Sequence, residues 1–228
     1  MERHRRGEQP YALVTDSSQG REFALELARL GFNVIIHSFS EEELAPARNE
    51  FAFKYPQITV KMLVQDSSVV VDWLNLIKHV EGLNITVLIN NVGASPTPFK
   101  PFDIISDDVI EKCIRVNSIF PTQFTRNLLP TLIERSPSLI LDICSASNCA
   151  RSGFITVLVW SQALYHELKL LKRDAECKAV MTENIQTYGH NVRTTLVTPT
   201  AEVSPVQLYL VLIVAGQCML AGGDMQCM

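Results

Sequence analysis

Short apolar runs alternate with helix-period segments along most of the chain. The runs are rich in Val, Ile, Leu and Thr, and their length suits strands buried on both faces of a parallel sheet. They predict six strands, over Tyr11–Thr15, Val34–His37, Thr59–Val64, Thr86–Asn90, Leu139–Ser145 and Val192–Thr198. The segments between them predict helices over Arg21–Leu30, Glu41–Tyr55, Val69–Val80, Asp107–Glu134 and about Ile155–Ile185. We expect Pro121 to kink or break the fourth helix.

Repeated strand–helix–strand units imply right-handed crossover connections and a doubly wound parallel sheet. The expected fold is α/β, a Rossmann-type sheet in three layers (α/β/α), and 228 residues fit a single domain. In such a sheet, ligands bind at the carboxyl ends of the strands, near the point where the strand order reverses. The residues that follow each strand therefore carry the functional argument.

Composition excludes several classes of protein. The chain is 47% hydrophobic and 19% charged, with a formal net charge of −4. Its basic residues are scattered apart from Arg3-His4-Arg5-Arg6, so we expect no nucleic-acid partner. The longest apolar run, Leu208–Ala215, is too short for a membrane span, which needs about 20 residues. No signal-peptide pattern opens the chain, and we expect an intracellular, cytoplasmic protein.

The six cysteines show no metal-binding arrangement. Cys144 and Cys149 are the nearest pair, and no second pair of His or Cys residues follows them. We therefore expect reduced thiols and no metal site.

Three polar motifs stand in a specific order along the chain. A buried-looking strand ends in Asn90-Asn91-Val92-Gly93, Asn117 closes the run Ile114–Asn117, and Ser145 closes the run Leu139–Ser145. That order and spacing resemble the short-chain dehydrogenase/reductase family. The likeness covers roughly residues 11–203, whereas residues 204–228 look atypical. Within the family it points to the branch of 3-ketoacyl-CoA reductases and 17β-hydroxysteroid dehydrogenases, especially fungal members.

The resemblance implies a nicotinamide cofactor and a small-molecule ketone or alcohol as substrate, with the keto group on a fatty acyl chain or a steroid. It favours NADPH, but the second strand ends in His37-Ser38-Phe39-Ser40, which contains neither the acid typical of NAD sites nor the arginine typical of NADP sites. The choice between NADP and NAD thus stays open. Relatives usually carry an apolar N-terminal membrane anchor, and we expect none in this chain. Peripheral contact with the endoplasmic reticulum and a homo-oligomer are both compatible with the resemblance.

The cofactor residues implied by the family pattern are spread over several strand ends. They are Thr15, Ser17, Gly20, Asp66, Asn91, Gly93 and Pro199. Asp16 and Glu22 stand where the family has glycines, and Asp16 would bring a carboxylate near a diphosphate. Two structural alternatives stay open: a plain turn between strand and helix after Thr15, and Asp66 as the cap of the helix predicted near Val69.

The catalytic residues implied by the family are only partly present. Ser145 matches the serine that binds the substrate oxygen, and Asn117 matches the asparagine that holds a relay water. The tyrosine that protonates the forming alkoxide should stand at residue 158, and the lysine that lowers its pKa at residue 162. Leu158 and Gln162 occupy those places, and neither side chain can perform that role.

A second tyrosine–lysine pair, Tyr165 and Lys169, lies seven residues further along the chain. At 1.5 Å per residue, that shift corresponds to about 10 Å along a helix. This pair could serve the site only if the helix began late, after a longer loop; otherwise both residues lie exposed on the helix. Two functions therefore remain: a reductase of this family with impaired activity, and a non-catalytic homologue that binds or scaffolds through the same fold.

Overall fold

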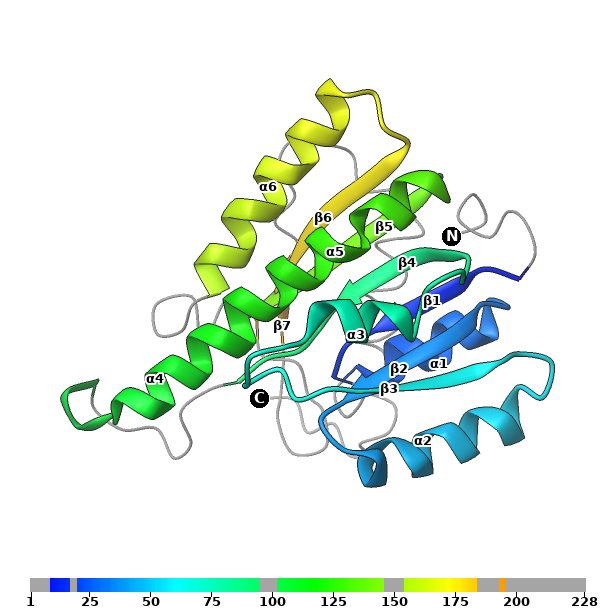
Figure 1. The fold of residues 1–228 in the computed structure, drawn as a ribbon, viewed down its shortest axis with the longest axis horizontal. Helices are drawn as coiled ribbons and strands as arrows, with labels where there is room; N and C mark the ends of the chain where they lie inside the picture. Colours follow the sequence, from blue (N-terminus) through cyan, green and yellow to red (C-terminus); the bar gives the residue numbers. More distant parts are fainter. Residues whose placement is uncertain (1–8, 17–19, 95–101, 146–153, 184–192, 196–228) are drawn as a thin grey trace, which may run out of the picture.

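The computed structural model describes residues 9–16, 20–94, 102–145, 154–183 and 193–195. Their strands form one sheet in the order β3-β2-β1-β4-β5-β6-β7 (Figure 1). All neighbours from β3 through β6 are parallel, and the strand order reverses between β1 and β4. The predicted doubly wound parallel sheet is confirmed.

Five of the predicted strands appear within one residue of their expected bounds. They are β1 (Tyr11–Val14), β2 (Asn33–Ser38), β3 (Val60–Val64), β4 (Ile85–Asn90) and β5 (Ser138–Ser145). Within β2 and β4 every residue is buried, as expected for central strands covered on both faces.

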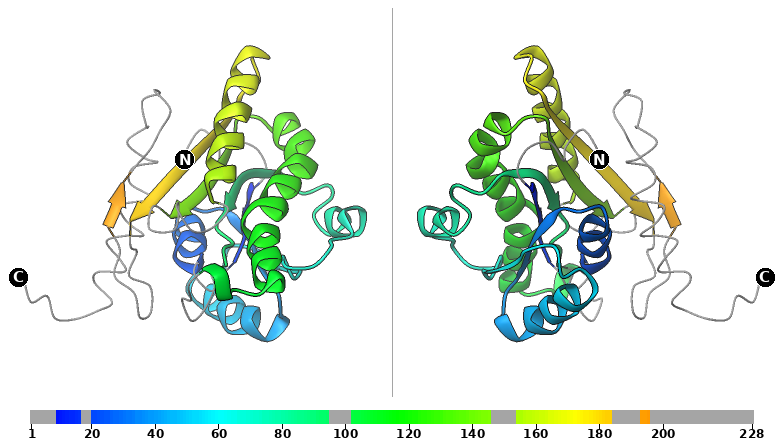
Figure 2. Two further views of the ribbon diagram at one scale, coloured as in Figure 1. Left: turned by 90° about the vertical axis from the view of Figure 1, so that its left-hand side faces the viewer. Right: turned by 90° about the vertical axis from the view of Figure 1, so that its right-hand side faces the viewer.

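Two groups of helices cover the two faces of the sheet (Figures 1 and 2). On one face, α1 (Arg21–Arg29) and α2 (Glu41–Lys54) pack on side chains such as Val14 and Ile36. On the other, α3 (Trp73–Lys78), α5 (Phe120–Glu134) and α6 (Phe154–Leu170) pack on side chains such as Leu13 and Leu88. Consecutive strand residues thus contribute to opposite cores, which follows from the two-residue period of a strand.

The predicted fourth helix is divided into shorter elements. After the 3-10 turn η2 (Phe102–Ile104) come α4 (Asp107–Ile114), the π-helical turn η3 (Arg115–Ile119) and α5. Pro121 has no N–H to donate to the carbonyl four residues earlier, and the helix widens into the π turn just before it. The widened turn contains Asn117.

The carboxyl-terminal part of the prediction is wrong in two respects. The last predicted helix ends at Leu170 instead of Ile185, and the sixth strand is β6 (Ala175–Glu183), parallel to β5, instead of Val192–Thr198. Of the predicted stretch, the described residues Arg193–Thr195 form the strand β7, which is antiparallel to β6.

Local backbone and burial explain this difference. Lys172 adopts a left-handed φ of 52°, and the Arg173 N–H donates to the Leu168 carbonyl at 2.9 Å, which closes the end of α6. Beyond that turn, Ala175, Cys177 and Ala179 are buried on alternate positions of β6. This two-residue period of small side chains is the strand signal that the sequence reading missed.

Candidate active site

Thr15 lies at the carboxyl end of β1, beside the point where the strand order reverses, and is fully buried. Its hydroxyl accepts hydrogen bonds from the backbone N–H groups of Asn91 at 2.9 Å and Val92 at 3.1 Å. It also lies 3.4 Å from the Ile89 carbonyl, to which it donates. The side chain therefore joins β1 to the end of β4, and its hydrogen bonds are made within the protein.

The turn that leaves β1 has a backbone conformation suited to glycine. Asp16 has a φ of 53°, in the left-handed region that side chains disfavour. The Gly20 N–H donates to the Asp16 carbonyl at 2.7 Å, and a Cβ on Gly20 would lie only 2.7 Å from that oxygen and 2.9 Å from Val14 Cγ1. Asn91 Nδ2 donates to the same carbonyl at 3.4 Å. Ser17 lies outside the described residues.

The backbone at the start of α1 is suited to binding a diphosphate. Gly20 is the N-cap and provides no side-chain hydrogen bond to the helix, so no such cap competes for the first-turn N–H groups. N–H groups at a helix N-terminus attract anions. The Asp16 carboxylate opposes this attraction. The residues present therefore fit a dinucleotide cofactor, with one unfavourable side chain.

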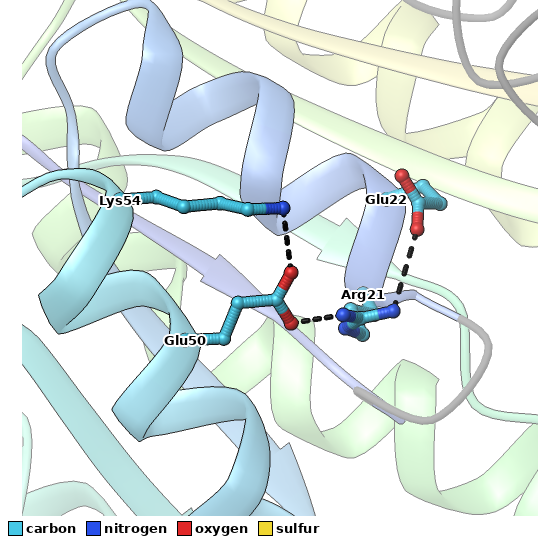
Figure 3. Close-up of polar contacts among 4 residues, drawn as sticks. All are labelled: Arg21, Glu22, Glu50 and Lys54. Carbon is cyan, nitrogen blue, oxygen red and sulfur yellow. Dashed lines mark hydrogen bonds and ion pairs between the residues drawn. The ribbon is translucent and has the colours of Figure 1, made fainter.

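Arg21, the first residue of α1, is paired with carboxylates of the protein itself (Figure 3). Its guanidinium bonds Glu50 on α2 and lies 3.7 Å from Glu22, while Lys54 donates to Glu50 at 2.7 Å. Burial acts to raise the pKa of Glu50, but the hydrogen bonds from Arg21 and Lys54 outweigh it and lower the pKa. These contacts join α1 to α2 beside the turn.

His37 in β2 is buried beside that turn. Its Nδ1 accepts a hydrogen bond from the Asp16 N–H at 3.4 Å, and its ring stacks on Phe120 with centroids 5.3 Å apart. Burial lowers the pKa of His37 to about 4, while the Gln65 backbone and the Asp66 charge act in the opposite direction. The imidazole is therefore neutral at pH 7 and packs as part of the core.

Asp66 follows β3 and lies at the same edge of the sheet. Its Oδ1 accepts hydrogen bonds from the N–H of Ser68 at 2.8 Å and from the Ser68 hydroxyl at 2.7 Å. Although burial acts to raise it, the pKa of Asp66 is lowered by these bonds and by Lys112 and His37. The alternative that Asp66 caps the next helix is wrong, because α3 begins at Trp73 and Asp72 provides its cap.

Asn117 is tied to the segment that follows β4. Its Oδ1 accepts from the Ala94 N–H and its Nδ2 donates to the Ala94 carbonyl, both at 2.7 Å. Asn117 is buried, whereas Gly93 is exposed at the carboxyl end of β4. The family pattern assigns this side-chain amide to a relay water. In the structure, its oxygen and its nitrogen each form one hydrogen bond with the Ala94 backbone.

A buried carboxylate, Asp142, is a residue that the sequence reading missed. It lies in β5, fully buried, beside Asn90 of β4 in the register of the sheet. Asn90 Nδ2 donates to Asp142 Oδ1 at 2.7 Å, and the Ser161 hydroxyl of α6 donates to Asp142 Oδ2 at 2.5 Å. A third contact comes from Cys177 Sγ of β6, 3.8 Å from Oδ2. The only sequence signal was a carboxylate inside the apolar run Leu139–Ile143.

Burial raises the pKa of Asp142 to about 6, although the bonds from Ser161, Asn90 and Cys177 lower it in part. Asn90 Nδ2 also donates to Thr125 of α5 at 2.8 Å. The carboxylate and Asn90 therefore link β4, β5, β6, α5 and α6 inside the core and hold α6 one residue before Gln162.

The helix α6 is continuous from Phe154, so the late start that would bring Tyr165 and Lys169 to the site does not occur. The end of α6 lies at the opposite edge of the sheet, because the Ser138 N–H, at the start of β5, donates to the Asp174 carbonyl at 3.1 Å. Lys169 Nζ donates to the Tyr165 hydroxyl at 3.3 Å and lies 5.5 Å from its ring centroid. This pair is therefore formed, but it lies two turns away from Leu158.

Two further predicted residues lie partly or wholly outside the described residues. Ser145 is the last residue of β5, which puts its backbone at the carboxyl edge with the ends of β1 and β4, but its side chain lies outside the description. Pro199 lies outside the described residues altogether.

The described part of the chain contains no group of three or more His, Cys, Asp or Glu residues arranged to hold a metal ion. Among the same residues, no helix combines the length and the apolar character needed to cross a membrane.

Comparison with known proteins identifies relatives of this chain. Very-long-chain 3-oxoacyl-CoA reductases from Emericella nidulans and Phaeosphaeria nodorum are 28% and 33% identical, over 78% and 70% of this chain and 53% and 50% of their own lengths. The chain spans about half the length of the curated relatives it matches.

Solved structures show the same fold. A short-chain dehydrogenase from Sphingobium yanoikuyae in complex with NADPH has a TM-score of 0.66 at 24% identity, covering 75% of this chain and 70% of that one. The bulky-bulky ketone specific alcohol dehydrogenase of Comamonas testosteroni has a TM-score of 0.72 at 20% identity, covering 92% and 84%. Residues 10–163, more than half of this chain, match the model of the short chain dehydrogenase family, and the chain therefore belongs to that family.

Proposed function

We propose that this chain binds a nicotinamide dinucleotide and descends from reductases that transfer hydride to a fatty acyl or steroid-like ketone, and that its own turnover is strongly reduced. The observation that carries the proposal is the course of α6, which runs unbroken from Phe154 through Leu158 and Gln162. The family pattern places its proton donor and the neighbouring lysine at these two positions.

Nucleotide binding is supported by the carboxyl edge of the sheet. The first-turn N–H groups of α1 would hold the diphosphate, and Asp66 and the exposed Gly93 lie at the ends of β3 and β4. When bound, the cofactor would supply the hydride. Asn91 acts indirectly, because its amide holds the Asp16 carbonyl and so the shape of the turn.

Weak turnover follows from the missing proton donor. A general acid contributes about 10²–10⁴-fold to the rate. Tyr165 cannot replace it, because seven residues of helix separate Tyr165 from Leu158, about 10 Å along the axis of α6. Ser145 alone would bind the carbonyl oxygen without delivering a proton to it.

The test compares binding with turnover. NADH and NADPH are titrated against the fluorescence of Trp73 and Trp160, and oxidation of both is then followed with 3-ketoacyl-CoA and steroid ketones. We expect saturable binding and little oxidation. Rapid oxidation would contradict the loss of activity, and a further loss in Tyr165→Phe would show that the displaced pair acts. Absence of binding would contradict the proposal as a whole.

A second candidate function is a non-catalytic binding or scaffold protein with the same fold. The residues at positions 158 and 162 favour it, because neither leucine nor glutamine can donate the proton or lower the pKa of a donor. This candidate predicts that the dinucleotide stabilises the fold without any turnover. A rise in melting temperature with NADH or NADPH, together with no detectable oxidation, would distinguish it from a slow enzyme.

A further inference from the structure

The structure assigns an acid to the end of β2 that the sequence did not indicate. Ser38, the last residue of β2, is buried, and its hydroxyl donates a hydrogen bond to Glu43 Oε2. Glu43 belongs to the first turn of α2, five residues further along the chain. The strand end itself, His37 to Ser40, contains no acid, so the local sequence does not indicate this carboxylate.

Glu43 is held in place through both its backbone and its side chain. The Glu43 backbone N–H donates to the Oγ of Ser40, the N-cap of α2, at 3.3 Å. In a capping box the glutamate side chain would reach back to the N-cap N–H. Here it reaches instead to Ser38, so that it is directed to the edge of the sheet.

One oxygen of this carboxylate is available to a ligand. Glu43 is exposed, and among the described residues only Oε2 has a hydrogen-bond partner. Its position in the chain, 23 residues after Gly20, is close to the spacing of about 20 residues at which Rossmann-type sites place a ribose-binding acid. A free carboxylate oxygen accepts from a ribose hydroxyl and repels a ribose phosphate.

Among the described residues, the cations nearest this edge already lie beside carboxylates. The first turn of α2 also contains Glu41 and Glu42, and Asp66 follows the neighbouring strand β3. Arg21 at the start of α1 is paired with Glu50 and Glu22 (Figure 3). The positive charge of Lys112 contributes to the lowered pKa of Asp66.

We propose that Glu43, positioned by Ser38, makes this chain select NAD(H) over NADP(H) by accepting a hydrogen bond from the adenosine ribose and repelling a 2′-phosphate. This inference rests on the proposed dinucleotide site. It is opposite to the NADPH preference that the family resemblance favours. The discrimination comes from one exposed helix residue and does not depend on the reaction centre.

The test uses two pairs of ligands that differ only in the 2′-phosphate: NADH and NADPH, and 5′-AMP and adenosine 2′,5′-bisphosphate. Affinities are measured on the full chain by calorimetry, without a turnover assay. We expect the ligand without the 2′-phosphate to bind about tenfold tighter or more, equivalent to about 1.4 kcal/mol. Raising the salt concentration should reduce the ratio, since exposed charges are screened.

Glu43→Gln should reduce this ratio to about threefold or less, because the repulsion is removed while the hydrogen-bonding size is kept. Glu42→Gln is the matched control: it removes the same charge from the same turn and should leave the ratio close to wild type. Glu43→Arg should reverse the preference. An equal ratio in Glu43→Gln and wild type, or a wild-type preference for the 2′-phosphate, would overturn the assignment of Glu43. Failure of all four ligands to bind would overturn the dinucleotide site itself.

Discussion

The turn after β1 and the first turns of α6 have diverged from the family pattern in different ways. At the turn, Asp16 keeps the left-handed backbone that a glycine would have, and Gly20 keeps its close contact with the Asp16 carbonyl. In α6 the helix is kept and Ser161 is buried against Asp142, but Leu158 and Gln162 replace the two chemical groups. A function performed by backbone N–H groups survives a side-chain substitution, whereas one performed by a side chain does not.

Restoring both side chains in α6 should have the largest effect. The double variant Leu158→Tyr/Gln162→Lys is expected to raise ketone reduction by about 10²-fold or more, since a general acid is worth about 10²–10⁴-fold. The assay is the steady-state oxidation of NADH or NADPH with a 3-ketoacyl-CoA. Each single variant should gain little, because the lysine acts through the tyrosine. If the double variant remains as slow as wild type, the loss lies elsewhere, for example at the turn after β1, where Asp16 replaces a glycine.

Removing the carboxylate that holds α6 should be the largest change in stability. Asp142→Ala leaves buried donors on Asn90 and Ser161 without their acceptor, which we expect to cost about 3 kcal/mol of unfolding free energy. Urea denaturation measures it. Ser161→Ala, which removes one donor and keeps the carboxylate, should cost about 1 kcal/mol. Equal costs for the two variants would mean that Asp142 does not organise this region.

The pH dependence of stability should separate the two regions. In the folded protein, the pKa of Asp142 is raised from 3.8 to about 6. Its contribution to the free energy of unfolding is therefore complete below pH 3.8 and is lost as pH rises through 6. In the folded protein, the pKa of His37 is lowered from 6.5 to about 4. Its contribution to the free energy of unfolding is therefore complete above pH 6.5 and is lost as pH falls through 4. The two buried groups therefore act in opposite directions.

Asp142→Asn should remove the first of these trends. Its stability difference from wild type is expected to shrink by on the order of 2 kcal/mol between pH 4 and pH 8, because the wild type alone must keep a charged carboxylate buried at the higher pH. Thermal or urea unfolding at several pH values measures this. A difference that is constant with pH would show that Asp142 titrates normally in the folded protein.

Relieving the turn should have the smallest effect. Asp16→Gly is expected to stabilise the fold by about 1 kcal/mol, since it removes the cost of a left-handed residue. The same change should tighten dinucleotide binding several-fold by removing a carboxylate near the diphosphate. Asp16→Ala is the control, because it removes the charge and keeps the strain. If Asp16→Gly and Asp16→Ala have equal stability, the turn is not strained.

Local patterns in the sequence were sufficient for the parallel sheet and for the positions of Asn91, Gly93 and Asn117 at or near its edge. Strands buried on both faces are continuous apolar runs, and five of them were found within one residue. The absence of a tyrosine at residue 158 and a lysine at residue 162 was equally visible, because helix register depends only on counting residues.

Other features were decided by contacts between distant residues. The end of α6 at Leu170 depends on the left-handed Lys172 and on the pairing of β6 with β5. The raised pKa of Asp142 needs burial among β4, β6 and α6, and the acid at the end of β2 comes from α2. The amino-acid sequence by itself thus determined the local elements from β1 to β5, because periodicity and turn chemistry are local. Only the tertiary structure decided which polar groups meet, because desolvation and hydrogen bonding depend on neighbours that are far apart in the chain.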